Sequence, residues 1–172
     1  MELLNGKMGS DHYYQLTCVV NNLQPVFSQP QIVRIVMDSW LYQKLHNKMS
    51  LYSYVVMEEH LHFLAQAPDL ELCLNSFLEQ TSAGIVCHLS TQGLERFLEK
   101  LPVDNSGYGS QLWQPAVECE LVTGDENMQK IIDYIHINPV KRGYVDNVTD
   151  WRYSSARNYA GENGLIEVDR WK

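Results

Sequence analysis

Tyr134 and Asn138 stand four residues apart in the segment Tyr134–Gly143 (YIHINPVKRG). A tyrosine hydroxyl can act as a nucleophile, and an asparagine side-chain oxygen can bind a hard cation. In an α-helix, residues four apart lie about 40° from each other around the axis and roughly one turn apart along it. If this segment is helical, one site can hold both side chains. Taken alone, any one of the ten tyrosines is more often a packing residue.

His60 and His62 form a second pair of candidate site residues, separated only by Leu61. Residues i and i+2 of a β-strand point to the same face, so both imidazoles can reach one metal ion. With six histidines in the chain, ordinary surface or sheet-packed histidines are the alternative interpretation. Together with Asn138, the pair makes an N, N, O ligand set. Such a set suits Mg²⁺ or Mn²⁺ better than structural zinc and leaves positions for phosphate oxygens.

The residues before Tyr134 predict the helix that carries it. Thr123–Glu126 (TGDE) has the form of a capping box, in which two side chains satisfy backbone N–H groups at a helix start. An apolar stripe at helical spacing follows and is expected to pack inward: Met128, Ile131, Ile132 and Ile135. Tyr134 and Asn138 lie beside this stripe, so their polar ends can face a cleft. Pro139 disfavours helical geometry at the preceding residue, which predicts a helix end at Ile137 or Asn138.

The rest of the chain predicts alternating strands and helices. The order β-α-β-β-α-β-α favours an α+β fold, namely a ferredoxin-like split β-α-β sandwich with an antiparallel four-stranded sheet. The helix that carries Tyr134 is added after the last strand of this fold. An aromatic-rich tail (residues 144–172) is expected to pack on the body of the protein. The elements predicted before that helix are strands at Tyr13–Asn21, Leu51–Met57, His60–Gln66 and Ala116–Val122, a helix at Gln31–Asn47, and one long or two short helices at Leu70–Lys100.

Composition limits the kind of partner. The 172 residues, 45% of them hydrophobic, can bury one core. The net charge of -8 argues against broad affinity for nucleic acid, because that affinity comes from Lys and Arg displacing counterions. No apolar run approaches the ~20 residues that cross a bilayer, and no signal peptide is evident. We therefore expect a cytoplasmic protein with no membrane partner, in which any nucleic-acid binding is local.

Four segments together resemble the insertion-sequence-200-like single-tyrosine (HUH) transposases, and most closely the REP-associated tyrosine transposases. Their order and spacing both fit, and the resemblance runs from about Tyr13 to Gly161. The tyrosine block and the downstream Asp-Trp block are far more specific than the histidine pair. The matching segments are Val55–His62 (VVMEEHLH), Leu112–Gln114 (LWQ), Asp133–Gly143 (DYIHINPVKRG) and Asp150–Arg157 (DWRYSSAR).

The resemblance implies a single-stranded DNA endonuclease and strand transferase that acts on single-stranded or hairpin DNA. His60, His62 and Asn138 would hold a divalent cation, Mg²⁺ or Mn²⁺, at the scissile phosphate, and Tyr134 would attack it to give a 5′-phosphotyrosine link. A phenol is a poor nucleophile at neutral pH, so metal assistance is physically reasonable. Four basic residues are candidate phosphate contacts: Lys141, Arg142, Arg152 and Arg157. The alternative interpretation is that they carry only solvated surface charge.

We expect one transposase-like domain, with residues 1–11 flexible, residues 12–143 forming the catalytic core and residues 144–172 packing on it as a tail. A homodimer that donates Tyr134 across its interface and a monomer that uses Tyr134 in cis are both compatible with the sequence.

Departures from the family pattern leave two alternatives open. Glu58 stands where family members usually have proline, Val117–Glu120 replaces an acidic residue and histidine that follow aromatics, and Leu78–Gln80 stands where lysines are usual. Acid thus replaces base on surfaces expected to meet DNA. One alternative is a repurposed family member that binds nucleic acid or protein without cleaving. The other is a metal-dependent phosphoesterase that uses water instead of Tyr134.

Overall fold

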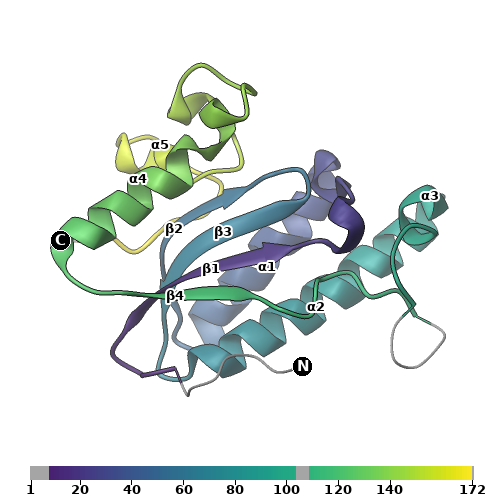
Figure 1. Cartoon of the computed structure of the whole chain (residues 1–172), viewed down its shortest axis with the longest axis horizontal. Helices are drawn as coiled ribbons and strands as arrows, with labels where there is room; N and C mark the ends of the chain where they lie inside the picture. Colours follow the sequence, from purple (N-terminus) through teal and green to yellow (C-terminus); the bar gives the residue numbers. More distant parts are fainter. Residues whose placement is uncertain (1–7, 104–108, 172) are drawn as a thin grey trace.

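The computed structural model of this chain describes residues 8–103 and 109–171 (Figure 1). Its four strands form one antiparallel sheet in the order β2-β3-β1-β4. The strands and the three long helices follow one another as predicted, so the ferredoxin-like α+β fold is confirmed. The long elements are β1 (Tyr13–Val19), α1 (Pro30–His46), β2 (Ser50–Val56), β3 (His60–Gln66), α2 (Leu70–Thr91), β4 (Glu118–Val122) and α4 (Asp125–Lys141). Short helical turns lie at η1 (Asn21–Leu23), η2 (Val26–Ser28), α3 (Glu95–Leu98), η3 (Val148–Asp150) and α5 (Ala156–Tyr159).

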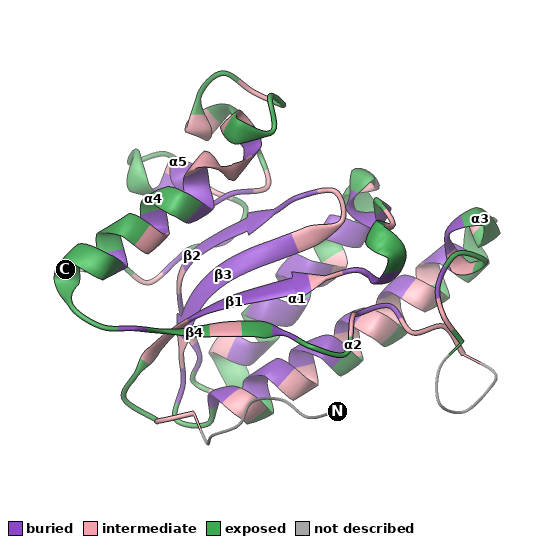
Figure 2. Cartoon of the chain, in the orientation of Figure 1, coloured by how far each residue is buried: buried purple, intermediate pink, exposed green. Residues whose placement is uncertain are grey.

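Helices cover both faces of the sheet. α1 and α2 pack on one face, and α4 crosses the opposite face against β2 and β3 (Figure 1). Leu61 and Phe63 of β3 belong to the core under α1 and α2, whereas Leu64 belongs to the core under α4. Figure 2 shows the central strands buried along most of their length. The alternation of side chains along β3 therefore decides which residues can meet α4.

The predicted apolar stripe of α4 is confirmed. Met128, Ile132 and Ile135 are fully buried and Ile131 is partly buried. They pack on a set of side chains from the sheet and its connections: Val55, Met57, Leu64 and Val122. Because the stripe allows only one rotation of the helix about its axis, it also fixes which flank of α4 faces β3.

The predicted capping box at the start of α4 is wrong. The N-cap residue is Gly124, with φ +81°, and no side chain caps the helix. The turn out of β4 needs a left-handed conformation, which glycine adopts without strain, and this moves the helix start one residue beyond Thr123. The carbonyl of Thr123 instead accepts a 2.8 Å hydrogen bond from Nδ2 of Asn127.

The predicted end of α4 at Ile137 or Asn138 is also wrong. The helix continues through Pro139 to Lys141, and Gly143 follows with φ +71°. Pro139 has no N–H for the carbonyl of Ile135. The side-chain amide of Asn138 approaches that carbonyl at 3.4 Å and donates to the carbonyl of Tyr134 at 2.7 Å. A side-chain donor thus compensates for the missing backbone donor.

Other boundaries differ by a few residues. The segment Leu70–Lys100 forms two helices, because the chain turns at Gly93 with φ +68° between α2 and α3. The first strand ends at Val19, and β4 begins only at Glu118. The expected flexibility of residues 1–11 stays a prediction, and residues 1–7 of this segment lie outside the described residues. The division into core and tail at residue 143 stays a prediction. In the described parts of the chain, no helix is long and apolar enough to span a membrane.

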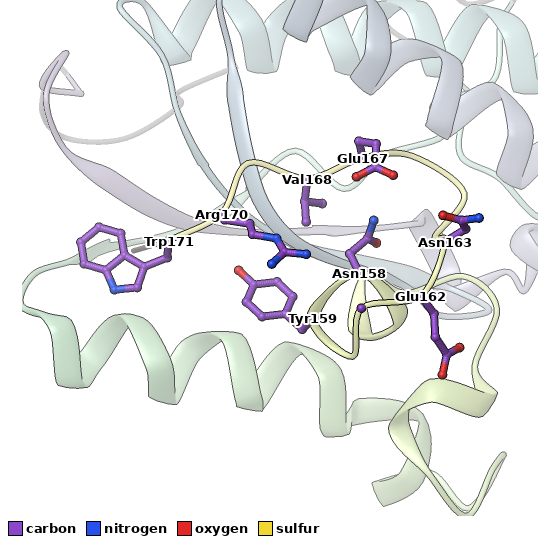
Figure 3. A pocket seen from close by; sticks show the side chains of 9 residues that line it. Asn158, Tyr159, Glu162, Asn163, Glu167, Val168, Arg170 and Trp171 are labelled. Carbon is purple, nitrogen blue, oxygen red and sulfur yellow. The ribbon is translucent and has the colours of Figure 1, made fainter.

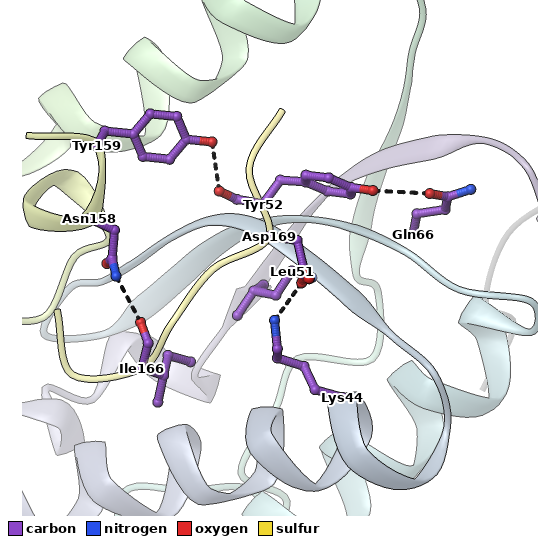
Figure 4. Close-up of polar contacts among 8 residues, drawn as sticks. All are labelled: Lys44, Leu51, Tyr52, Gln66, Asn158, Tyr159, Ile166 and Asp169. Carbon is purple, nitrogen blue, oxygen red and sulfur yellow. Dashed lines mark hydrogen bonds and ion pairs between the residues drawn. The ribbon is translucent and has the colours of Figure 1, made fainter. Parts of the chain in front are cut away.

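The C-terminal tail lies along the outer edge of β2. The backbone N–H of Val56 donates to the carbonyl of Tyr153 at 2.8 Å, and Ser154 forms a bridge with Val55. Nε1 of Trp151 donates to the carbonyl of Val56 at 3.0 Å. The tail therefore satisfies backbone groups that an edge strand leaves unpaired. Two further tail side chains bond to the backbone of β2: Tyr159 to the carbonyl of Tyr52 (Figure 4), and Asp169 to the N–H of Leu51. Figure 4 also shows Asn158 bonded to Ile166 within the tail and Asp169 paired with Lys44 of α1.

Candidate active site

His60 and His62 lie side by side on β3 and face α4. Their ring centroids are 4.9 Å apart, whereas Leu61 between them points into the opposite core. His62 is 6% exposed. The geometry expected from a His-x-His sequence on a strand is therefore present.

Each histidine uses its Nδ1 atom within the protein. Nδ1 of His62 lies 2.9 Å from Oγ1 of Thr17 on the neighbouring strand β1. Nδ1 of His60 lies 3.2 Å from Oε1 of Glu59. Within residues 8–103 and 109–171, the Nε2 atoms of both rings have no hydrogen-bond partner. Histidines that bind metals are usually held in this way, with one nitrogen bonded to an outer group and the other available.

Both histidines favour the neutral form. Burial lowers the pKa of His62 to about 4, and the neighbouring His60 contributes to the shift. Burial also lowers the pKa of His60, against the opposing effect of Glu59. A histidine must be neutral to donate a nitrogen lone pair to a metal ion. The site therefore holds both rings in the form that metal binding requires.

Tyr134 lies above this pair on α4. Its ring meets the ring of His62 nearly edge to face, with centroids 5.6 Å apart, and the side chain is 40% exposed. Nζ of Lys141 lies 5.4 Å from the centre of the Tyr134 ring. Tyr134 also lines a groove of about 530 Å³ that is open to solvent. The other residues along this groove are Lys130, Asp133, His136, Ile137, Lys141 and Val148.

Asn138 lies on α4 between Tyr134, which contacts β3, and Arg142, which contacts the turn before β3. Tyr134, Asn138 and Arg142 follow one another at intervals of four on one flank of the helix. Tyr134 touches His62, and Arg142 bonds to Glu59 next to His60. Asn138 uses its Nδ2 group on α4 itself, and its Oδ1 atom has no hydrogen bond to any described residue. This oxygen is therefore available as a third ligand.

The donor atoms fit a hard divalent cation. Among the described residues, no cluster of three or more His, Cys, Asp or Glu side chains could hold a metal ion. A cation between His60 and His62 would therefore take its remaining ligands from Asn138, from water or from a substrate phosphate. This combination of imidazole and oxygen donors with open positions suits Mg²⁺ or Mn²⁺.

The four basic residues predicted to contact phosphate lie in different places. Lys141 lies at Tyr134, as described above. Arg142 reaches the site but is engaged by Glu59, at 2.5 Å. Nε of Arg157 donates to the carbonyl of Thr149 at 2.8 Å, and Arg152 lines a groove beside α1. The structure therefore brings the first two cations to the histidine face and gives the last two no contact with it.

Three further residues contribute to the site, and no role was assigned to Thr17 or His136 from the sequence. Thr17 and Glu59 hold the histidines, and His136 is buried behind Tyr134. Nε2 of His136 lies 3.1 Å from Oγ of Ser53 and 2.8 Å from Oγ of Ser155. The position of His136 between Tyr134 and Asn138 was a signal, but the helical period puts it on another face. Its role is structural, since it joins α4, β2 and the tail.

A separate hollow of about 270 Å³ lies between α5 and the C-terminal segment (Figure 3). Tyr159 and Arg170 point into it, and the hydroxyl of Tyr159 already donates to the carbonyl of Tyr52. None of the candidate site residues lines this hollow. It belongs to the packing of the tail and is distinct from the histidine site.

The arrangement of the site on the sheet can now be compared with that of known proteins. A ferredoxin-like sheet presents two histidines of one strand to a tyrosine on a helix that covers the same face. Comparison with known proteins shows that the chain is similar to REP-associated tyrosine transposases. It is 31% identical over 108 residues to a Haemophilus influenzae protein provisionally given that name, a match that covers 58% of this chain and 54% of the relative. It is 34% identical over 58 residues to the REP-associated tyrosine transposase of Escherichia coli K12, or 34% of each chain.

The chain thus matches about half the length of the first relative and a third of the second. A solved REP-associated tyrosine transposase bound to a REP hairpin has the same fold, with a TM-score of 0.67. That match covers 100% of this chain and 94% of the other, at 18% sequence identity. No protein-family model matches the chain. The resemblance inferred from the motifs is confirmed in sequence and in fold.

Proposed function

We propose that this chain nicks and rejoins single-stranded DNA, with Tyr134 as the nucleophile. One observation carries the proposal: the Tyr134 ring lies against His62, on the face where His60 and His62 leave their Nε2 atoms available. A candidate nucleophile thus lies in ring contact with one of two candidate metal ligands. Similarity to REP-associated tyrosine transposases supports the same assignment.

His60, His62 and Asn138 would hold Mg²⁺ or Mn²⁺ through Nε2, Nε2 and Oδ1. When bound, such an ion withdraws charge from a phosphate and orients it. Thr17 and Glu59 keep the imidazoles in place for this task. α4 holds Asn138 and Tyr134 on the same flank, so the ligand and the nucleophile approach the phosphate together.

Tyr134 provides the covalent chemistry. Its oxygen forms a bond to phosphorus, the bond from phosphorus to the 3′ oxygen breaks, and the phenol proton leaves to solvent while the 3′ oxygen takes up a proton. The product is a 5′-phosphotyrosine ester with a free 3′ hydroxyl. The ester conserves the energy of the broken bond, so attack by a 3′ hydroxyl can rejoin DNA without ATP. Lys141, beside the Tyr134 ring, places a positive charge where this phosphate would lie.

The substrate we propose is a DNA hairpin with a single-stranded flank. The solved neighbour is bound to a REP hairpin, and the groove beside Tyr134 is open to solvent. Because the chain has a net charge of -8, its affinity for DNA must come from local contacts and not from the charge of the whole protein.

A second candidate is a module that binds without cleaving. It is favoured by Glu118 and Glu120, which are exposed on β4, next to β1 on the sheet that carries the histidines. These carboxylates would repel the phosphates of a strand that approaches from this side. A phosphoesterase that uses water is the remaining alternative.

The test is incubation of the protein with labelled hairpin DNAs from its own genomic neighbourhood and Mn²⁺ or Mg²⁺. Denaturing gels and mass spectrometry then detect a covalent adduct. We expect an adduct on Tyr134 that is absent with chelator and in Tyr134→Phe. The matched control is Tyr42→Phe, because Tyr42 is exposed to a similar degree on α1, which covers the other face of the sheet.

Two other outcomes have distinct meanings. Binding of hairpins with no adduct in the native protein would favour the binding module. Cleavage that survives in Tyr134→Phe and leaves no adduct would favour the phosphoesterase.

A further inference from the structure

The turn between β2 and β3 carries two adjacent carboxylates, and both bond to the end of α4. Oε2 of Glu58 accepts a 3.0 Å hydrogen bond from the hydroxyl of Tyr144. Oε1 of Glu59 accepts a 2.5 Å bond from Nη2 of Arg142. We call these four residues the acidic clasp. The clasp joins the turn that precedes the histidine strand to the helix that carries the nucleophile.

The backbone of this turn is itself held in place. The N–H of Val20 donates to the carbonyl of Glu59 at 2.9 Å, and the N–H of Phe27 donates to the carbonyl of Glu58 at 3.1 Å. The side chain of Glu59 is only 13% exposed. A carboxylate held at its backbone and shielded from water has little freedom to reorient. Glu59 therefore acts as a fixed acceptor and not as a solvated turn residue.

The same oxygen of Glu59 that binds Arg142 also contacts His60. Oε1 lies 3.2 Å from Nδ1 of His60. An ionised carboxylate can only accept hydrogen bonds, so a neutral His60 that bonds to Glu59 carries its hydrogen on Nδ1. The lone pair is then on Nε2, which faces away from Glu59. This position also excludes Glu59 itself as a ligand of a metal at Nε2.

We propose that Glu59 is the positioning residue of this site. It holds His60 in the Nδ1–H tautomer and, through Arg142, holds the C-terminal end of α4 over β3. Because Asn138 lies one turn before Arg142, the same carboxylate fixes two of the three proposed ligands relative to each other. The metal part of this inference rests on the proposed function, whereas the tautomer of His60 does not.

The first measurement is the tautomer of His60, by ¹⁵N chemical shifts of the imidazole nitrogens in the metal-free protein at neutral pH. We expect the Nδ1–H form in the native protein and a shift toward Nε2–H in Glu59→Ala. Glu59→Gln should keep the native tautomer in part, since an amide oxygen can still accept from Nδ1–H. A merely structural role for Glu59 would not produce this order among the variants.

The second measurement is affinity for Mn²⁺ alone, by calorimetric titration without DNA. We expect Glu59→Ala to bind about 10-fold more weakly, as is typical when an outer carboxylate of a metal-bound histidine is lost. Glu59→Gln should lose less. The matched control is Glu126→Ala, because Glu126 is also paired with a cation, Lys130, but lies at the other end of α4.

The outcomes separate this inference from the proposed function. An unchanged His60 tautomer in a folded Glu59→Ala protein overturns the inference, even if the protein forms DNA adducts. A tautomer that depends on Glu59 in a native protein without Mn²⁺ affinity supports the positioning role and overturns the metal-dependent function. Thermal unfolding of each variant shows whether it is folded, and Glu59→Gln provides the test if Glu59→Ala is not.

Discussion

The chemistry of this site depends on which nitrogen of each histidine ring bonds within the protein and which nitrogen is available to a ligand. His62 and His60 hold Nδ1 against different partners, Thr17 on β1 and Glu59 in the preceding turn. Both Nε2 atoms are left for a ligand. Burial keeps the two imidazoles neutral because a charged ring would lose hydration that the protein does not replace. The pair is therefore already arranged for the cation that we propose.

Thr17 gives a direct test of this arrangement. Thr17→Val keeps the shape of the side chain and removes the oxygen that lies 2.9 Å from Nδ1 of His62. We expect a fall of about 10-fold in Mn²⁺ affinity, because His62 loses the partner that orients it. Calorimetric titration measures the change, with Thr91→Val as control, since Thr91 bonds only within α2. Native affinity in Thr17→Val would show that the strand itself orients His62.

Lys141 gives a second test at the scale of one residue. Its ammonium lies 5.4 Å from the centre of the Tyr134 ring. A cation at this distance from an exposed ring contributes about 0.5–1 kcal/mol. Lys141→Met keeps the length of the side chain and removes the charge, so we expect adduct formation on Tyr134 to slow about two- to five-fold with unchanged Mn²⁺ affinity.

The rate is followed by single-turnover assays on denaturing gels. Lys130→Met is the control, because Lys130 lines the same groove but pairs with Glu126. An equal loss in both variants would mean that Lys141 contributes only general positive charge.

Among the helices and strands, α4 positions the candidate site residues against the sheet. Its apolar stripe holds it on the sheet, its exposed flank carries Tyr134 and Asn138, and the acidic clasp fastens its end to the turn before His60. Because the stripe and the flank belong to one rigid helix, any loss of packing under α4 also moves Tyr134, the proposed nucleophile.

Ile135→Ala tests this coupling. Ile135 is fully buried between α4 and the sheet. We expect the free energy of unfolding to fall by about 2–5 kcal/mol, the usual cost of this substitution in a core. Urea unfolding followed by circular dichroism measures it.

Adduct formation should fall more steeply with temperature in Ile135→Ala than in the native protein, because local opening of α4 displaces Tyr134. Gln129→Ala, on the exposed side of the same helix, should change stability by less than about 0.5 kcal/mol. A native temperature profile in Ile135→Ala would contradict the coupling.

At the scale of the whole molecule, a buried polar cluster joins three distant segments. His136 of α4 bonds to Ser53 of β2 and to Ser155 of the tail, and its ring packs on Tyr159. Burial lowers the pKa of His136 to about 4. The downstream Asp-Trp motif of the sequence thus has a structural explanation, since Trp151 and Ser155 attach the tail to the edge of β2 and to α4.

Acid should destabilise the protein through this cluster and through His62. Unfolded histidines ionise near pH 6.5, whereas the pKa values of His62 and His136 are about 4 in the folded chain. Between these values the unfolded chain binds protons that the folded chain does not. The free energy of unfolding therefore falls as the pH falls from 6.5 toward 4.

Urea midpoints measured between pH 7 and pH 4.5 test this prediction. His136→Gln cannot take up a proton at this position, so we expect a shallower dependence on pH than in the native protein, whatever its stability at pH 7. His46→Gln is the control, because His46 lies exposed at the end of α1. Identical slopes in the native protein and His136→Gln would show that His136 does not contribute to acid sensitivity.

The features that depend on local periodicity could be predicted from the residues alone. Alternation along a strand placed His60 and His62 on one face, and the helical period placed Tyr134 and Asn138 on one flank beside a buried stripe. The order of the elements predicted the sheet, because split β-α-β units have few ways to pair their strands. Composition and spacing act over short stretches of chain, so no tertiary contact was needed for these conclusions.

The groups that surround those residues could not be predicted in this way, because they come from distant parts of the chain. The register of β1 against β3 puts Thr17 beside His62, and the docking of α4 puts Arg142 on Glu59. The passage of α4 through Pro139 also required a side-chain donor that is visible only in three dimensions. The periodicity of each element predicts which of its sides is buried, but the packing between segments far apart in the sequence decides which of their residues lie opposite one another.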